Sequence, residues 1–134
     1  MVVSPSFVCR GKSHAEGLGV LLRACHDFCV AHALPLRAVS QIFVLCDEVI
    51  ANIARHGYGN KTAGHITVRM RLRAGGLLIV FSDEAEPFNP LVFRATRTNT
   101  AGGFGLSLLK SFADKARYYR RRGCNVLVLW KNIK

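Results

Sequence analysis

The stretch from residue 65 to residue 83 limits the fold most, because its apolar residues repeat with a period of two. In HITVRMRLR (65–73), apolar side chains alternate with threonine and arginine, which predicts a half-buried strand with a basic outer face. Gly75 and Gly76 then predict a turn into a second strand, LLIVFSD (77–83). A fold that contains this hairpin needs another layer to cover its apolar side.

Two amphipathic helices are expected before the hairpin and supply such a layer. Apolar residues recur at three- and four-residue steps from Ser13 to His32, with Ser13 as the expected N-cap before Glu16. A second helix is expected to start at Pro35 and to continue its apolar face through to Gly57.

The remaining segments complete the predicted order. Residues 2–10 are expected to form a short edge strand, and 84–103 a long irregular segment with two prolines. A helix over 104–116 and a hairpin that turns at Gly123, with Asn125 close behind, follow.

The resulting order, β-α-α-β-β-loop-α-β-β, predicts an α+β fold. We expect a two-layer α/β sandwich in which a mostly antiparallel sheet carries its helices on one face. The chain has 134 residues, of which 50% are hydrophobic, so residues 1–134 are expected to form a single domain.

Composition narrows the functional classes. The formal net charge of +11 favours an anionic partner, yet five of the eight acidic residues fall in two stretches, 47–48 and 83–86. The longest apolar runs are too short to span a membrane, and the start lacks the order of a signal peptide, so we expect a soluble cytoplasmic protein without membrane contact. Five cysteines without a CxxC pair are expected to be reduced core residues.

Glu48, Asn52 and His56 form the first candidate site, because a spacing of four residues places them along one ridge of a helix. An interior Asn in an apolar helix calls for a partner, and its amide oxygen suits Mg²⁺ together with phosphate and water. The alternative is a solvated helix face.

The second candidate site is Asp83 at the end of a strand, with Phe88 nearby. Its carboxylate can accept a hydrogen bond from an exocyclic amine such as that of adenine, and Phe88 can provide an apolar contact to the base. The alternative is an ordinary turn aspartate.

The third candidate site is AGGFGLSLLK (101–110), in which glycines precede a helix. Backbone amides at such a helix start can approach a phosphate, and Arg94 and Arg97 in the preceding segment suggest a lid over it. The stretch is not a P-loop, because no lysine follows the last glycine.

Together these motifs resemble the ATP-binding domain of gyrase-type topoisomerases, histidine kinases and mismatch-repair ATPases, and most of all the anti-sigma-factor serine/threonine kinases of the RsbW type. ExxxNxxxHxY, from Glu48 to Tyr58, is similar to the N box of that family. DEAEPF (83–88) is similar to its first glycine box, and GGFGLSLLKSFAD (102–114) to its second.

The resemblance implies a role for each matching position. Glu48 is the general base, Asn52 holds Mg²⁺, and Asp83 binds the adenine amine of ATP. The other cofactor-binding positions that it implies are His56, Phe88, Gly102, Gly103, Phe104, Gly105 and Leu106.

The implied protein is an ATP-dependent kinase that phosphorylates an antagonist on serine and also sequesters a sigma factor, in a partner-switching circuit. The resemblance further implies a homodimer, and Arg23 on the first helix is a candidate partner contact beside the alternative of a solvated arginine.

Two other functions stay open. Ala85 stands where the family usually has glycine, which excludes a positive φ and narrows the space beside the base, so a non-catalytic binding module with a degenerate site is one alternative. The other is a nucleic-acid binder, suggested by the net charge and by RYYRRR (117–122), although direct binding of nucleic acid is disfavoured because no RNP1 motif is present.

Overall fold

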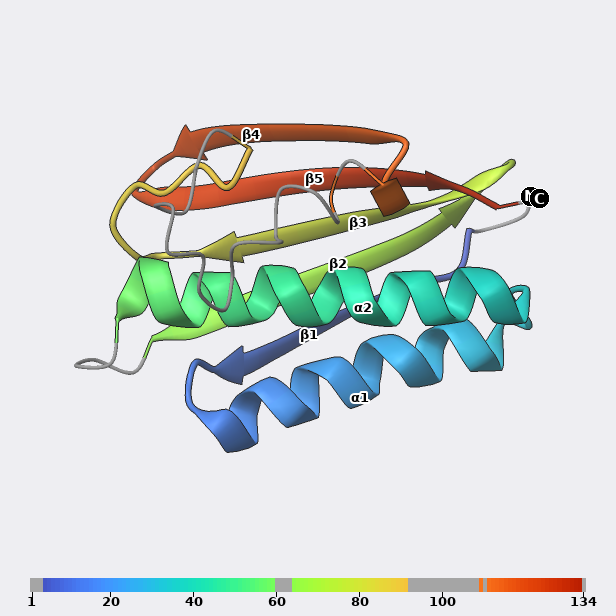
Figure 1. Ribbon diagram of the computed structural model, residues 1–134, viewed down its shortest axis with the longest axis horizontal. Helices are drawn as coiled ribbons and strands as arrows, with labels where there is room; N and C mark the ends of the chain where they lie inside the picture. Colours follow the sequence, from blue (N-terminus) through green and yellow to red (C-terminus); the bar gives the residue numbers. More distant parts are fainter. Residues whose placement is uncertain (1–3, 60–63, 92–108, 110, 134) are drawn as a thin grey trace.

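The computed structural model describes residues 4–59, 64–91, 109 and 111–133. Two helices run along the strands of an antiparallel sheet (Figure 1). In chain order the elements are β1 (Ser6–Lys12), α1 (Ala15–Ala31), α2 (Leu36–Asn52), the π-helix η1 (Ile53–Tyr58), β2 (His65–Arg73), β3 (Gly76–Asp83), β4 (Lys115–Arg121) and β5 (Cys124–Asn132).

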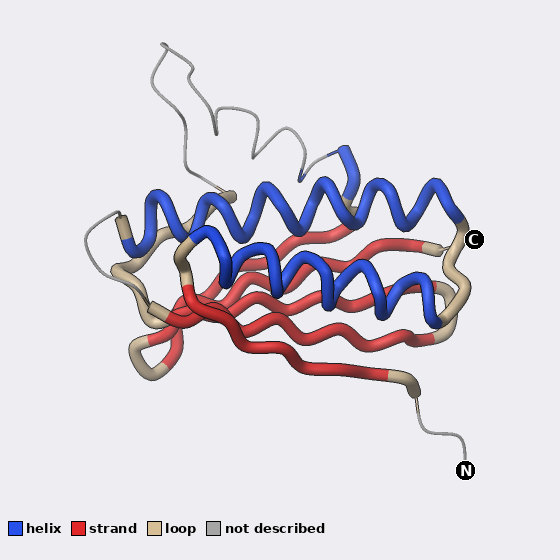
Figure 2. The backbone as a smooth tube through the Cα atoms, turned by 90° about the horizontal axis from the view of Figure 1, so that it is seen from below, coloured by secondary structure: helices blue, strands red, loops and turns tan. Residues whose placement is uncertain are grey.

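The five described strands form one sheet in the order β1-β2-β3-β5-β4, and every neighbouring pair is antiparallel. Figure 2 shows α1 and α2 together on one face of this sheet. The predicted α+β sandwich with helices on one face is therefore confirmed, as is the edge position of the first strand.

The core lies between the helices and the inner face of the sheet. Alternate residues of the central strands point inward, so β3 and β5 contribute every second side chain. The largest fully buried side chains come from the helices and the three strands β2, β3 and β5: Leu21, Cys25, Ile42, Leu45, Ile50, Ile66, Val68, Met70, Leu77, Ile79, Phe81 and Leu129.

The start of α1 differs from the prediction in its cap. His14, not Ser13, is the N-cap residue, and its Nδ1 accepts a hydrogen bond from the backbone N–H of Gly17 at 3.1 Å. Ser13 joins the next segment instead, because its Oγ accepts from the Gly64 backbone N–H at 2.9 Å and its own N–H donates to the Gly64 carbonyl. The chain before α1 is thus tied to the start of β2.

The second helix was expected to run unbroken to Gly57, and this was wrong. α2 ends at Asn52, and the chain continues as the π-helix η1 to Tyr58. The apolar period carries through this change because Ile53 stays buried, so the sequence pattern hides it. Single π-helical turns are rare in proteins, and those that occur are often found at functional sites.

The last predicted helix ends earlier than residue 116. Lys115 and Ala116 belong to β4, and Asp114 marks the change: its N–H donates to the Trp130 carbonyl at 2.8 Å and its Oδ2 accepts from the Asn132 N–H at 2.7 Å. The closing hairpin is confirmed, with its turn at Arg122 and Gly123, which both have positive φ.

The cysteines are free, as expected, and three of them are buried between the helices and the sheet. Burial raises the pKa of Cys29 to about 12, so its thiol stays protonated. Among the described residues, no helix has the length and apolar character needed to cross a membrane.

Two glycines of α1 should respond in opposite ways to replacement by alanine. A Cβ on Gly17 would lie 2.1 Å from the Lys12 backbone oxygen, so Gly17→Ala is expected to destabilise the protein by about 1–3 kcal/mol. A Cβ on Gly19 meets nothing within 4 Å, so Gly19→Ala is expected to stabilise it by up to about 1 kcal/mol. Urea denaturation of both variants measures the difference, and equal free energies of unfolding would contradict it.

Candidate functional site

Glu48 and Asn52 lie one turn apart on α2 and point to the same side, as their spacing predicted. The Oε2 atom of Glu48 is buried and has no hydrogen-bond partner among the described residues. Asn52 is 5% exposed, and its Oδ1 accepts a long hydrogen bond of 3.3 Å from Nη1 of Arg55. Burial of a carboxylate oxygen without a hydrogen-bond partner is unfavourable. The side of the helix that carries Glu48 and Asn52 is therefore a candidate binding site.

His56 lies on the π-helix η1, after the end of α2, and not on a continuation of the α-helical ridge. Its ring stacks on Phe88, with 5.6 Å between the ring centroids and 21° between the planes. Burial and the positive charge of Arg55 lower the pKa of His56, against the opposing effect of Glu48. Residues of the first and second predicted motifs therefore meet here.

Asp83 ends β3 and is buried on the inner face of the sheet. Its Oδ1 accepts two hydrogen bonds, from Nδ2 of Asn125 at 2.9 Å and from the Ala85 N–H at 3.0 Å. Oδ2 accepts none from the described residues, which leaves one carboxylate oxygen for a ligand. Burial raises the pKa of Asp83, because removal from water disfavours the charged form more than these hydrogen bonds and Arg120 favour it.

Asn125 is the site residue that the sequence analysis missed. It is not a turn residue but a buried member of β5, directly opposite Asp83 in the sheet. Besides Asp83, its Nδ2 donates to the Glu86 carbonyl at 2.9 Å, while its Oδ1 accepts from the Phe88 N–H, Arg120 Nη1 and the Tyr118 hydroxyl. An asparagine at an inward position of an alternating strand was the available signal.

Tyr58 connects the end of η1 to both neighbouring strands. Its hydroxyl donates to the His65 carbonyl at 2.6 Å, at the start of β2, and accepts from the Glu84 N–H at 2.8 Å, just after β3. Burial raises the pKa of this phenol. The segment after Asp83 is therefore held from both sides, by Tyr58 and by Asn125.

Ala85 fits this segment without strain. It is buried and does not have a positive φ, so its backbone conformation does not require glycine. Its methyl group points toward Gly57, because a Cβ built on Gly57 would lie 3.1 Å from the Ala85 Cβ. Ala85 is also absent from the residues that line the adjacent pocket.

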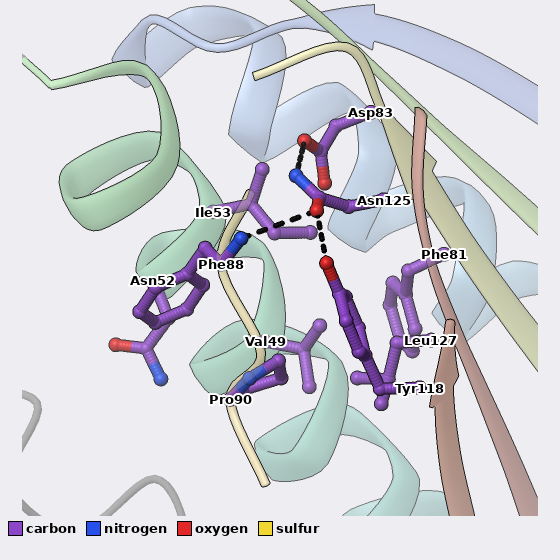
Figure 3. A pocket seen from close by; sticks show the side chains of 10 residues that line it. All are labelled: Val49, Asn52, Ile53, Phe81, Asp83, Phe88, Pro90, Tyr118, Asn125 and Leu127. Carbon is purple, nitrogen blue, oxygen red and sulfur yellow. Dashed lines mark hydrogen bonds between the residues drawn. The ribbon is translucent and has the colours of Figure 1, made fainter. Parts of the chain in front are cut away.

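A mostly apolar pocket opens between α2 and the strands β3, β4 and β5 (Figure 3). Its walls enclose about 280 Å³, part of which is open to solvent. The lining residues are Val49, Asn52, Ile53, Phe81, Asp83, Phe88, Pro90, Tyr118, Asn125 and Leu127. The slot as it stands has room for about one water molecule, but its apolar walls, with a carboxylate and an amide at one end, carry the groups that recognise a flat heteroaromatic ring with an amine.

Most of the glycine-rich motif of residues 101–110 is not part of the described structure. Gly102, Gly103, Phe104, Gly105 and Leu106 lie outside the described residues, as do Arg94 and Arg97. The described site therefore contains the predicted N box and first glycine box.

Solved structures share this fold. The chain superimposes with a TM-score of 0.72 on the RsbU and RsbW domains of Rv1364c from Mycobacterium tuberculosis, over 96% of this chain and 32% of that one, at 14% identity. A blue-light activated histidine kinase from Erythrobacter litoralis matches with a TM-score of 0.57, over 75% of this chain and 32% of that one, also at 14% identity.

A relative is found by sequence as well. The serine/threonine-protein kinase BtrW of Bordetella bronchiseptica is 34% identical over 92 residues, which span 63% of this chain and 65% of that kinase. The resemblance to RsbW-type kinases that the motifs indicated is confirmed by these comparisons. The family model of the histidine kinase-like ATPase domain matches residues 12–131, and this chain belongs to that family.

Proposed function

We propose that this chain is an ATP-dependent protein serine/threonine kinase that also acts as an anti-sigma factor. In this proposal it phosphorylates an antagonist protein on serine and sequesters a sigma factor when the antagonist is modified. The kinase relative supports the phosphoryl-transfer part. The sigma factor, the antagonist and the homodimer are predictions that follow from the resemblance to RsbW-type kinases.

The observation that carries the proposal is one unused carboxylate oxygen in an apolar pocket and a second one on the helix that forms a wall of that pocket. Asp83 Oδ2 lies at the end of the pocket and accepts no described hydrogen bond, which suits the exocyclic amine of adenine. Glu48 Oε2 is buried without a partner in the helix that forms the wall, next to Val49 and one turn before Asn52. In this proposal Asp83 marks the base-binding end of the site, and Glu48 with Asn52 marks its phosphate end.

The donor set on α2 fits Mg²⁺. Magnesium prefers oxygen ligands and keeps several waters, and Asn52 Oδ1 is such an oxygen. No group of three or more His, Cys, Asp or Glu side chains in the described part of the chain is arranged to hold a metal. Phosphate and water would therefore complete the coordination, with Asn52 as the protein ligand, and the bound ion would neutralise charge on the phosphates.

Glu48 is proposed as the general base. The Glu48 Oε2 atom accepts no hydrogen bond from the described residues, so it can accept the proton of the attacking serine hydroxyl. Arg55, whose Nη1 donates to Asn52 Oδ1, is placed to compensate negative charge at the same end of the pocket. Phosphoryl transfer requires mainly this kind of positioning and charge neutralisation.

The first test is binding of ATP with and without Mg²⁺, measured by isothermal titration. We expect Mg²⁺-dependent binding that Asn52→Ala weakens by at least about tenfold, because the variant loses the metal's protein ligand. Ser40→Ala, at an exposed position of the same helix, is the control for a polar side chain lost from α2. Binding that is equally tight in Asn52→Ala would contradict the metal assignment, and no binding at millimolar ATP would favour a module that binds only protein.

The second test separates a kinase from a binding module. Glu48→Gln keeps the shape of the side chain and removes its basicity, so ATP affinity should change by less than about threefold while phosphoryl transfer falls by about 10² or more. Transfer to a serine of a purified antagonist, or release of phosphate to water, measures the rate. A variant with undiminished transfer would show that Glu48 is not the base.

The third test concerns Ala85. Because its methyl group faces Gly57 and not the pocket, Ala85→Gly should alter ATP affinity by less than about threefold. Gly57→Ala should destabilise the wild-type background more than the Ala85→Gly background, with a coupling energy of about 0.5 kcal/mol or more. A large gain in ATP affinity in Ala85→Gly would instead show that the methyl group obstructs the base.

A further inference from the structure

Asn125 uses the hydrogen-bonding capacity of its side chain inside the protein (Figure 3). It is buried, and its Nδ2 donates to Oδ1 of Asp83 and to the carbonyl oxygen of Glu86, each at 2.9 Å. Its Oδ1 accepts from three donors: the Phe88 N–H, Arg120 Nη1 and the Tyr118 hydroxyl. A primary amide has two N–H donors and one oxygen with two lone pairs, so both ends of this side chain are occupied.

These partners determine which end of the amide faces Asp83. In the flipped orientation, the amide oxygen would face the carboxylate of Asp83 and the carbonyl of Glu86. The NH₂ group would then face the guanidinium of Arg120, so acceptors would meet acceptors and donors would meet donors. The N–H of Asn125 is therefore held against Oδ1 of Asp83.

This contact controls the state of the Asp83 carboxyl group. Oδ1 accepts from the Asn125 side chain and from the Ala85 N–H, so a proton on a neutral Asp83 would bind to Oδ2, the oxygen that is left for a ligand. Burial raises the pKa of Asp83, and the hydrogen bond from Asn125 is the largest of the effects that oppose this shift, before those of Ala85 and Arg120. Asn125 therefore favours the ionised group, in which Oδ2 is an acceptor.

The state of Oδ2 decides which purine the pocket accepts. An ionised oxygen accepts a hydrogen bond from an amino group at position 6 of the ring, as in adenine. It repels a carbonyl oxygen at the same position, as in hypoxanthine, because two acceptors then face each other without a proton. A protonated Oδ2 would donate a hydrogen bond and would reverse this preference.

We propose that Asn125 sets the base selectivity of the pocket: by donating to Oδ1 of Asp83 it keeps Oδ2 an acceptor, so that the pocket selects a 6-aminopurine over a 6-oxopurine. Asn125 acts through Asp83 and not through contact with the base, which makes it a positioning residue. This role rests on the proposed function, in which the pocket holds the base of ATP.

A structural role of Asn125 has a different signature from a role in selectivity. Asn125 also holds the backbone of Glu86 and Phe88, and a looser pocket wall would lower the affinity for every purine nucleotide alike. A role in selectivity changes the ratio of two dissociation constants, those of ATP and of inosine triphosphate (ITP). ITP has the ribose and phosphates of ATP and carries a carbonyl group in place of the 6-amino group.

The test is isothermal titration of ATP and of ITP, each with Mg²⁺, into the wild type and two Asn125 variants. The wild type should bind ATP at least about thirtyfold more tightly than ITP. Asn125→Leu removes the donor to Asp83, and Asn125→Asp keeps the shape but places a second carboxylate there, so that the two acids share a proton. Both variants should weaken ATP by at least about tenfold and change the affinity for ITP by less than about threefold.

Two other asparagines give matched controls. Asn52→Ala acts at the proposed phosphate end of the same pocket, so it should weaken ATP and ITP by factors within about threefold of each other and preserve their ratio. Asn132 lies at an exposed position of β5, where its Oδ1 accepts from Trp130 Nε1 at 2.8 Å. Asn132→Ala should alter neither dissociation constant by more than about threefold. Thermal denaturation verifies that each variant is folded.

Two results would overturn the role of Asn125 alone. Wild-type affinities for ATP and ITP within about threefold of each other would show that the pocket does not select on this group, and this result requires no variant to fold. An unchanged ratio in the folded Asn125 variants, with both nucleotides weakened alike, would reduce Asn125 to a structural residue. A wild type that binds neither nucleotide would overturn the proposed function and this role together, so the two failures are distinct.

Discussion

The hydrogen bond between Asp83 and Asn125 is the interaction on which the site depends. These residues are paired at the end of the two central strands, where the inward side chains change from apolar to polar. Removal of either group would leave the other buried without its partner, which is far less favourable than the modest net gain of the bond itself. Through Asn125 the same cluster also holds the backbone of Glu86 and Phe88, so the shape of the pocket follows from one pair of facing residues.

The second constraint is that the helices α1 and α2 cover only one face of the sheet. Because α1 and α2 both lie on the inner face, alternate residues of each strand meet either the core or the open face. The core side carries Leu77, Ile79 and Phe81 on β3, whereas the intervening residues Leu78 and Val80 are only half-buried. Strands with apolar residues on both sides are typical of a sheet that is covered on both faces.

Local pattern predicted most of the elements. Strict alternation gave β2 with its observed ends, and helical periodicity gave α1 and α2 with small errors at the caps. The π-helix was missed because Ile53 continues the apolar period while the backbone changes its hydrogen bonding. His14 replaced Ser13 as the cap because Ser13 bonds to Gly64, a contact between segments distant in sequence.

The site was predictable only in part for a similar reason. Glu48, Asn52 and Asp83 stand out locally, as polar residues within or directly after apolar segments. Asn125 does not, because it follows a turn glycine and its role comes from pairing with Asp83, 42 residues earlier. The relation between Ala85 and Gly57 is also non-local, so the sequence alone suggested a defect where the structure has a compensating pair of small residues.

The pocket and the open face of the sheet share their strands, and this limits how they can communicate. Phe81 and Leu127 line the pocket, while their neighbours Val80 and Val126 face the opposite side. The central strands are hydrogen-bonded on both edges, so a shift that transmits binding across them would break many bonds at once. The β4–β5 hairpin is less constrained, because β4 is an edge strand: Arg120 reaches inward to the Ala85 carbonyl, and its neighbours point to the open face. Among the described elements, this hairpin is therefore best placed to transmit a change at the open face to the pocket.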